Sequence, residues 1–366
     1  MPATRSSSKL FSPLQVGPNK LQHRIVMAPL TRFRADDDHV PLPLVKQYYG
    51  QRACVPGTLL ISEGVFISPE AGDYPNAPGI FSDAQIAAWK EVTDEVHANG
   101  SFIWLQLWAL GRAASGKGSE LVSSSDIPIE EGKPAPRPLT EDEIQNYIRA
   151  YAKAASNAVH RAGFDGVEIH GANGYLVDQF IQDTANRRTD KWGGSIENRS
   201  RFAVEVARAV SEAVGADRTG IRLSPWSTFQ GMKMAEPLPQ FLDVVERLKG
   251  LRLAYLHLVE SRIAGNVDIE ATESNAALVE AWGKTSPVFL AGGFKPDSAQ
   301  KTADEEHKDI DVAVVFGRLF IANPDLVYRV QHGLELNPYN RETFYNAKEA
   351  KGYLDYPFSE QFQSKA

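Results

Sequence analysis

The chain has 366 residues, 43% of them hydrophobic and 23% charged, and a formal net charge of -7 at pH 7. This composition is typical of a folded globular protein and excludes a disordered chain, while the acidic balance lacks the basic surplus of a nucleic-acid-binding protein. The single cysteine, Cys54, excludes intrachain disulfides, iron–sulfur clusters and cysteine-based zinc sites, all of which need several thiolates. We expect Cys54 itself to be a buried, unreactive thiol.

No stretch of the sequence approaches the 18 or so apolar residues that span a bilayer, and the first residues carry no apolar signal segment. We therefore expect a cytoplasmic protein that binds neither membranes nor nucleic acid.

Short apolar runs bounded by turn residues predict eight strands along the chain. In chain order they are Arg24 to Pro29, Thr58 to Gly64, Ser101 to Leu107, Gly166 to Gly171, Thr219 to Pro225, Leu253 to Glu260, Pro287 to Gly293 and Val312 to Arg318.

Segments with helical periodicity follow these strands. They are Leu42 to Ala53, Asp83 to His97, Glu141 to Ala162, Glu197 to Val214, Leu238 to Leu248, Glu273 to Trp282, Asp297 to Glu306 and Pro324 to His332. Ser82 with Gln85, and Thr140 with Glu143, fit the pattern of a capping box at a helix start.

The regular alternation of strand and helix favours a single (β/α)8 TIM barrel. A doubly wound sheet is the alternative, but no Gly-x-Gly-x-x-Gly motif follows any of the predicted strands. The insertion at 109–139, after the third strand, is rich in Gly, Ser and Pro and is predicted to form a cap.

The carboxyl ends of the strands in such a barrel carry the functional groups. His170 and Asn173 lie three residues apart at the end of the fourth strand, where two donors can converge on a carbonyl oxygen, although a histidine at a strand end is often purely structural. Tyr175 lies two residues further on and stays protonated at neutral pH, so it can donate a proton.

Arg222 interrupts an apolar strand, which is costly unless the charge faces an anionic ligand or a carboxylate of a neighbouring strand. From the residues alone, the partner of Arg222 could be either the ligand or the carboxylate. Glycines end the seventh and eighth strands, where barrels of this type commonly bind phosphate. These residues are Gly292, Gly293 and Gly317, the last followed by Arg318.

Five sequence blocks in this order resemble the Old Yellow Enzyme family of FMN-dependent ene-reductases and NADPH dehydrogenases, in a fungal-type form. The blocks span 27–35, 105–111, 167–176, 188–199 and 316–326, and the likeness extends from about Leu10 to Pro357. Two residues depart from the family pattern: Trp192 stands where tyrosine is frequent, and Arg112 stands where some yeast members have an aromatic residue.

The resemblance implies one FMN-binding barrel domain over 1–366, with the cap at 109–139 and a C-terminal extension at 334–366. It implies a tightly but non-covalently bound FMN, reduced by NADPH, and no metal. The residues implied to bind FMN are Pro29, Leu30, Thr31, Gly64, Gln106, Arg222, Gly292, Gly293, Gly317 and Arg318.

The resemblance also implies the chemistry. His170 and Asn173 would bind the carbonyl oxygen of an α,β-unsaturated ketone or aldehyde, the flavin would pass a hydride from N5 to the β-carbon, and Tyr175 would protonate the α-carbon. Trp108, Trp226 and Tyr345, with Phe344 close by, would form the walls of the substrate pocket.

Two alternatives stay open at this point. One is a flavin-dependent isomerase or redox-neutral enzyme of secondary metabolism on the same scaffold, and the other is a barrel that binds a ligand without catalysis. The expected partner is a small-molecule substrate, and the expected assembly is a monomer or homodimer.

Overall fold

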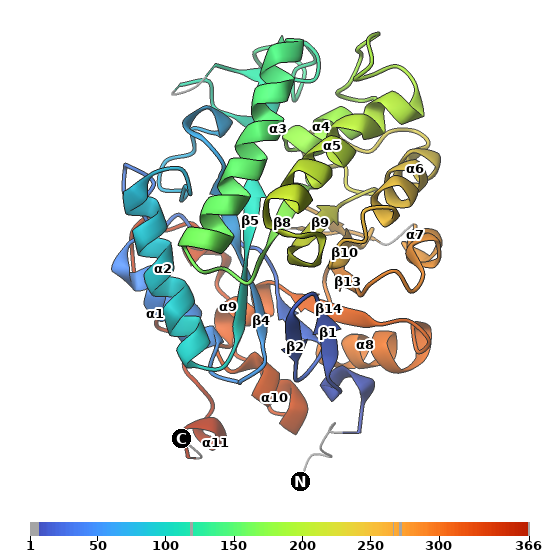
Figure 1. The fold of residues 1–366 in the computed structure, drawn as a ribbon. Helices are drawn as coiled ribbons and strands as arrows, with labels where there is room; N and C mark the ends of the chain where they lie inside the picture. The colour runs from blue at the N-terminus through green and yellow to red at the C-terminus, as the bar shows by residue number, and fades with distance from the viewer. Residues whose placement is uncertain (1–6, 118–119, 266, 271–272, 365–366) are drawn as a thin grey trace.

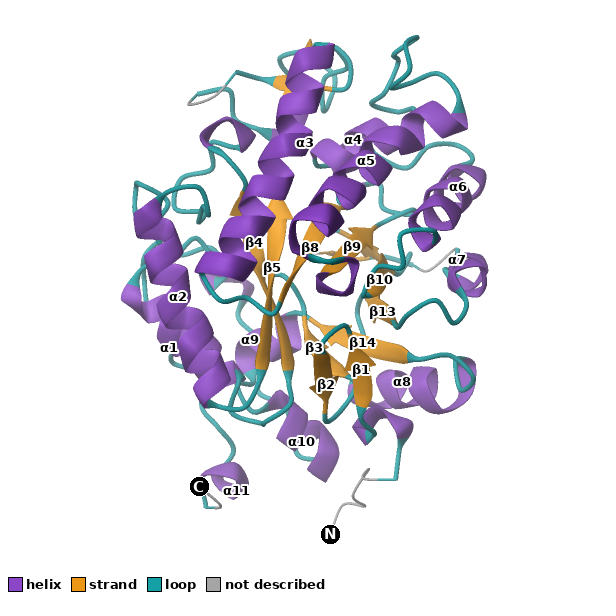
Figure 2. Cartoon of the chain, in the orientation of Figure 1, coloured by secondary structure: helices purple, strands orange, loops and turns teal. Residues whose placement is uncertain are grey.

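A computed structural model describes residues 7–117, 120–265, 267–270 and 273–364 of the chain. Eight parallel strands form a closed barrel in it, surrounded by helices, so the predicted (β/α)8 architecture is confirmed (Figures 1 and 2). The strands are β3 (Ile25–Met27), β4 (Leu59–Phe66), β5 (Phe102–Trp108), β8 (Gly166–Gly171), β9 (Thr219–Leu223), β10 (Tyr255–Val259), β13 (Val288–Ala291) and β14 (Val312–Phe316). Each strand pairs with its neighbours in this order, and β14 pairs with β3 to close the barrel.

The eight predicted helical segments are present on the outside of the barrel. They are α1 (Pro43–Arg52), α2 (Asp83–Ala98), α3 (Glu141–Ser156), α5 (Ile196–Val214), α6 (Pro237–Lys249), α7 (Ala276–Trp282), α8 (Pro296–Lys301) and α10 (Leu326–His332). Both predicted capping boxes are confirmed: the Ser82 hydroxyl caps α2 and the Thr140 hydroxyl caps α3. In the part of the chain that is described, no helix is long and apolar enough to cross a membrane.

A short hairpin that the sequence did not predict closes the amino end of the barrel. Its strands, β1 (Leu14–Val16) and β2 (Asn19–Leu21), have three residues each, too few to show a periodic pattern. Leu14, Val16 and Leu21 pack into the barrel interior, and the Asn19 side chain accepts a hydrogen bond of 3.0 Å from the indole of Trp104. The hairpin leaves the carboxyl ends of the strands as the open end of the barrel.

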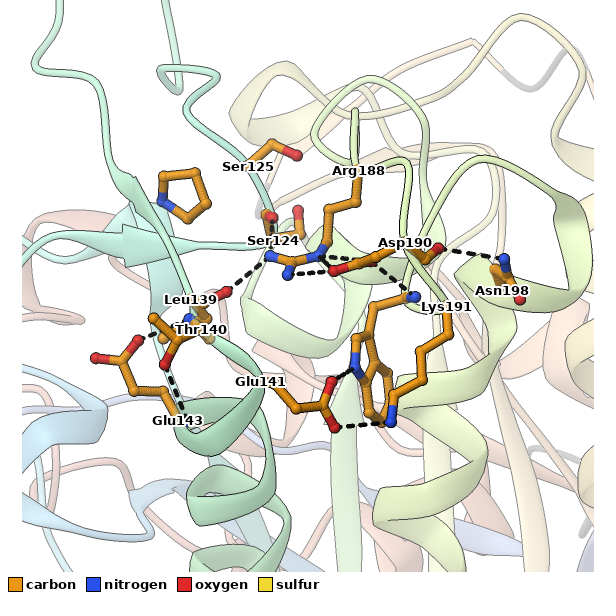
Figure 3. A network of polar contacts seen from close by, with 12 residues as sticks. Ser124, Ser125, Leu139, Thr140, Glu141, Glu143, Arg188, Asp190, Lys191 and Asn198 are labelled. Carbon is orange, nitrogen blue, oxygen red and sulfur yellow. Dashed lines mark hydrogen bonds and ion pairs between the residues drawn. The ribbon is translucent and has the colours of Figure 1, made fainter.

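The predicted cap at 109–139 follows β5 and is tied to the barrel by polar contacts. Its two short strands, β6 (Val122–Ser123) and β7 (Arg137–Pro138), pair with each other. One guanidinium nitrogen of Arg188 donates to the carbonyls of Ser124 and Leu139, at 2.9 and 2.8 Å, while Asp190 holds the other side of the guanidinium (Figure 3). Arg188 therefore ties the middle of the cap, at Ser124, and its carboxyl end, at Leu139, to a single point.

Trp192, which stands where the family frequently has tyrosine, belongs to the same network of contacts outside the barrel. Its indole N–H donates to Glu141 at the start of α3, and its ring packs edge-on against Phe202 of α5. Lys191 pairs with the same Glu141 carboxylate at 2.9 Å (Figure 3). Trp192 thus contributes to the outer structure and does not line the cavity described below.

The C-terminal segment lies against the open end of the barrel and is held there by two buried arginines. Arg32 donates to the carbonyls of Phe344 and Gly352, at 3.0 and 2.7 Å. Arg34 donates to the carbonyl of Phe344 and to that of Lys351. These bonds connect the segment that follows β3 to the segment that carries Phe344.

Candidate active site

A cavity of about 910 Å³ opens at the carboxyl ends of the strands. This volume lies in the upper part of the range for ligand pockets. Most of the residues singled out from the sequence line it: Pro29, Leu30, Thr31, Gln106, Trp108, His170, Asn173, Tyr175, Arg222, Gly292, Gly293, Gly317, Arg318, Phe344 and Tyr345. Segments from distant parts of the chain thus meet around one space.

Two of the residues singled out from the sequence lie outside the lining. Trp226 follows β9, but its ring is buried and its indole N–H donates to the Asn275 side chain at 2.9 Å. Gly64 lies in β4 beside an irregularity of the β4–β5 pairing, directly under the indole of Trp108. A Cβ at Gly64 would come within 2.8 Å of that indole, so the glycine lets Trp108 lie flat against the strand.

Trp108 is the centre of an aromatic wall in the cavity. It stacks on Phe66 with ring centroids 5.1 Å apart and meets the edge of Tyr175 at 5.0 Å. Within the described residues the indole N–H of Trp108 has no hydrogen-bond partner. This wall gives the cavity a rigid apolar side against which a flat ligand can pack.

His170 is a neutral imidazole that carries its proton on Nε2. Burial, together with the nearby Arg222 and His257, holds the pKa of His170 well below its ordinary value. The Nδ1 atom of His170 accepts a hydrogen bond from the backbone N–H of Ala172 at 3.4 Å. A neutral imidazole whose Nδ1 accepts carries its proton on Nε2, so His170 is a hydrogen-bond donor at Nε2.

A tight turn presents Asn173 and Tyr175 beside His170. Asn173 and Gly174 both adopt the left-handed backbone region, with φ of 59° and 76°. The turn is held by the Ser224 hydroxyl, which accepts from Asn173 N–H at 2.7 Å, and by Asp178, which accepts from Gly174 N–H at 2.8 Å. Burial raises the pKa of Asp178 to about 7.

The side chains at this turn are suited to proton donation. The His170 and Tyr175 rings lie with centroids 4.9 Å apart. Burial raises the pKa of Tyr175 above its ordinary value, so the phenol stays protonated at neutral pH. The Oδ1 atom of Asn173 is buried without a partner among the described residues, as is Oε1 of the neighbouring Gln230.

Sequence reasoning missed a buried network beneath Gln106 and Arg222. Glu168 and His257 are fully buried and do not line the cavity, yet they contact these two lining side chains. Arg222 does not contact the carboxylate of a neighbouring strand directly: it donates to His257, which in turn contacts Glu168 of the neighbouring strand β8. Neither of the two partners considered from the sequence, an anionic ligand or a directly paired carboxylate, therefore describes Arg222 completely. The signal was available: Glu168 shares the inward face of its strand with His170, two residues on.

The far end of the cavity combines glycines with basic side chains. Gly292 and Gly293 have φ of 126° and 62°, a backbone that only glycine adopts without strain. Arg318 begins the short helix α9 (Arg318–Ala322) and forms an ion pair with Asp268, with nitrogen–oxygen distances of 2.7 and 2.5 Å. Glycine backbone amides next to a guanidinium suit an anionic group such as a phosphate, which would compete with Asp268 for Arg318.

Cys54 lies away from this cavity. It is half-buried, and its thiol donates to the Pro324 carbonyl at 3.6 Å. Burial raises the pKa of Cys54 to about 12, which leaves it unreactive as a nucleophile. The described residues contain no group of three or more His, Cys, Asp or Glu side chains that could hold a metal ion.

Comparison with known proteins gives a family and a set of fungal relatives, among them the probable inactive dehydrogenase easA of Claviceps purpurea, 54% identical over 99% of this chain and 98% of its own. The NADH:flavin oxidoreductase / NADH oxidase family, with FMN as its flavin, matches residues 9–337. The chanoclavine-I aldehyde reductase fgaOx3 of Penicillium roqueforti is 59% identical over 97% of this chain and 98% of its own. The NADP-dependent oxidoreductase lnbE of Aspergillus flavus is 57% identical over 97% of each chain.

A solved structure extends this likeness to three dimensions. The Old Yellow Enzyme from Pichia sp. superimposes with a TM-score of 0.90 at 39% identity, over 97% of this chain and 95% of that one. The chain therefore belongs to the NADH:flavin oxidoreductase / NADH oxidase family and is an NAD(P)H-dependent FMN oxidoreductase of the Old Yellow Enzyme type.

Proposed function

We propose that this protein is an NADPH-dependent ene-reductase, which reduces the activated C=C bond of α,β-unsaturated ketones and aldehydes. The observation that carries the proposal is that His170, Asn173 and Tyr175 line the same cavity from one strand end and the turn after it, with the His170 and Tyr175 rings 4.9 Å apart. Two potential carbonyl-binding side chains beside a protonated phenol are the groups that this reaction requires.

The residues present fit FMN. Pro29, Leu30 and Thr31 would lie along the ring system, with Thr31 and Gln106 supplying polar contacts to its edge. Arg222 would place a positive charge beside the part of the ring that becomes negative on reduction. Gly292, Gly293, Gly317 and Arg318 would hold the phosphate, and Gly64 would support the ring edge indirectly by seating Trp108. When bound, FMN supplies the hydride, which originates from NADPH and is delivered to the substrate β-carbon.

The chain's own side chains do the remaining work. His170, which donates from Nε2, and the Asn173 amide would donate hydrogen bonds to the substrate carbonyl oxygen and draw electron density away from the alkene. Tyr175 would supply the proton to the α-carbon from its hydroxyl group. Trp108, Phe344 and Tyr345 would surround the substrate and exclude water from it.

The deciding experiment follows the visible spectrum of the anaerobic holoprotein. Addition of NADPH is expected to bleach the flavin band, and a simple enone such as cyclohexenone is expected to restore it. The Tyr175→Phe variant should bleach at the wild-type rate and recover slowly. Recovery of the variant at the wild-type rate would refute Tyr175 as the proton donor, and a wild-type flavin that enones never reoxidise would refute the ene-reductase proposal.

A further inference from the structure

A buried carboxylate lies beneath the two polar residues of the cavity floor. Glu168 is fully buried, and one of its oxygens accepts a hydrogen bond from Gln106 Nε2 at 2.8 Å. Its other oxygen accepts from the Tyr255 hydroxyl at 3.0 Å and from His257 Nδ1 at 2.7 Å. His257 is also fully buried, and its Nε2 atom lies 3.4 Å from Nε of Arg222.

The chemistry of these groups determines where the protons lie. Arginine has only donors, so His257 Nε2 must accept from Arg222, and its Nδ1–H must donate to Glu168. His257 is therefore a neutral imidazole in one fixed tautomer. Burial lowers the pKa of His257, in agreement with this assignment. The negative charge of Glu168 and the positive charge of Arg222 face each other across an uncharged ring.

The same carboxylate also fixes the orientation of Gln106. A carboxylate only accepts hydrogen bonds, so the NH₂ group of Gln106 must point to Glu168, which leaves the amide oxygen to serve as an acceptor elsewhere. Gln106 and Arg222 line the cavity, whereas Glu168, His257 and Tyr255 do not. Glu168 is thus connected to both polar floor residues without itself meeting a ligand.

We propose that Glu168 and His257 are positioning residues that orient Gln106 and Arg222 toward the flavin and set how strongly the site stabilises the reduced ring. This inference rests on the proposed placement of FMN against Gln106 and Arg222. The Glu168 carboxylate offsets part of the positive potential of Arg222, and the neutral His257 keeps the guanidinium in place.

The substitution Glu168→Gln changes charge and hydrogen-bond polarity with little change in shape. Tyr255 and His257 both donate to the same oxygen of Glu168. In the variant the amide oxygen therefore takes the place of that oxygen, and the new NH₂ group faces the NH₂ group of Gln106. Gln106 must then turn over or leave a donor unpaired. We expect a more positive midpoint potential for the bound FMN, because a negative charge is lost beside Arg222. We also expect weaker FMN binding, with a Kd at least tenfold larger than that of the wild type.

The matched control is Tyr255→Phe. It removes one hydrogen bond from the same carboxylate and leaves the charge and the Gln106 contact in place. Its midpoint potential should stay at the wild-type value. A Glu168→Gln holoprotein with the potential of the wild type would overturn the proposal, even if its activity were reduced.

A second measurement needs no variant and tests the hydrogen-bond arrangement of His257 independently of which reaction the protein catalyses. Nitrogen NMR of the histidine rings in the wild-type holoprotein should show His257 neutral, with its proton on Nδ1, in both the oxidised and reduced states. An imidazolium at His257, or a proton on Nε2, would overturn the proposed arrangement. Failure of the protein to reduce enones would refute the proposed function but would not change this spectrum.

Discussion

Replacement of Arg112 by alanine is expected to loosen the cap above the cavity without unfolding the barrel. Arg112 is almost fully buried, and its guanidinium donates to the carbonyls of Ile127 and Pro128 in the cap, at 3.3 Å each. It also donates to the carbonyl of Gln230 at 3.0 Å and contacts the sulfur of Met232 at 3.3 Å. One side chain therefore joins the cap to the loop that follows β9.

The size of the effect follows from these contacts. A hydrogen bond to a charged group contributes about 1.5–3 kcal/mol. We assign the lower value to the two longer bonds, those to the carbonyls of Ile127 and Pro128. The buried guanidinium is also costly to desolvate, which lowers the pKa of Arg112 and offsets part of the gain. We estimate a net contribution of about 3 kcal/mol, which corresponds to a roughly hundredfold larger open population of the cap.

Hydrogen exchange measured by mass spectrometry tests this estimate. In Arg112→Ala, amides of residues 120–130 should exchange about a hundredfold faster, while amides of β5 keep the wild-type rate. The control is Arg137→Ala, since Arg137 is a cap residue whose side chain is 40% exposed and is paired with Glu120 and Glu143. Exposed pairs contribute little, so this variant should change exchange by less than tenfold. Equal exchange in Arg112→Ala and wild type would refute the reasoning.

Three further predictions concern single side chains. Tyr175→Phe should slow enone reduction by about 10²–10⁴-fold and leave flavin reduction by NADPH unchanged, as measured by stopped flow of the two half-reactions. Gly64→Ala should destabilise the protein by about 1–3 kcal/mol, because its Cβ meets the Trp108 indole; an unchanged denaturation midpoint would contradict this. Burial lowers the pKa of His23 to about 4, below its ordinary value of 6.5, so this residue destabilises the fold as the pH falls from 6.5 toward 4. In denaturant titrations, the free energy of unfolding should fall by about 3 kcal/mol less between pH 7 and pH 4 in His23→Gln than in the wild type. An equal fall in both proteins would exclude the role of His23.

The barrel could be predicted because its signal is repeated along the whole chain. Each strand is buried on both faces and therefore appears as a short apolar run, and the helix that follows carries its own periodicity and caps. The hairpin of β1 and β2 was missed because strands of three residues have no such pattern. The short helix α4 (Leu176–Ile181) was also missed, because all six of its residues are buried, the polar Asp178 and Gln179 included, so no exposed polar face marks a helical period.

The candidate site could be predicted where a residue's position along a strand determines its direction. His170, Gln106 and Arg222 follow this rule and meet in the cavity. Trp226 lies beyond the end of β9, where the loop and not the strand decides the direction of the side chain.

The inward direction of Glu168 could be predicted from its alternation with His170 along β8, but its partners in the buried network could not. The contacts of Glu168 with Gln106 and His257 depend on the pairing of β5, β8, β9 and β10. That register brings together residues up to 89 positions apart, and no spacing within the sequence expresses it.

The most direct test of the central claim is the position of the transferred hydride. NADPH deuterated at the transferring C4 position would be incubated with the holoprotein and an α,β-unsaturated aldehyde such as cinnamaldehyde, and the product analysed by mass spectrometry and NMR. We expect a saturated aldehyde with deuterium on the β-carbon, and NADPH and substrate consumed in equal amounts. An allylic alcohol with deuterium on the carbonyl carbon, or an isomerised product formed without consumption of NADPH, would contradict it.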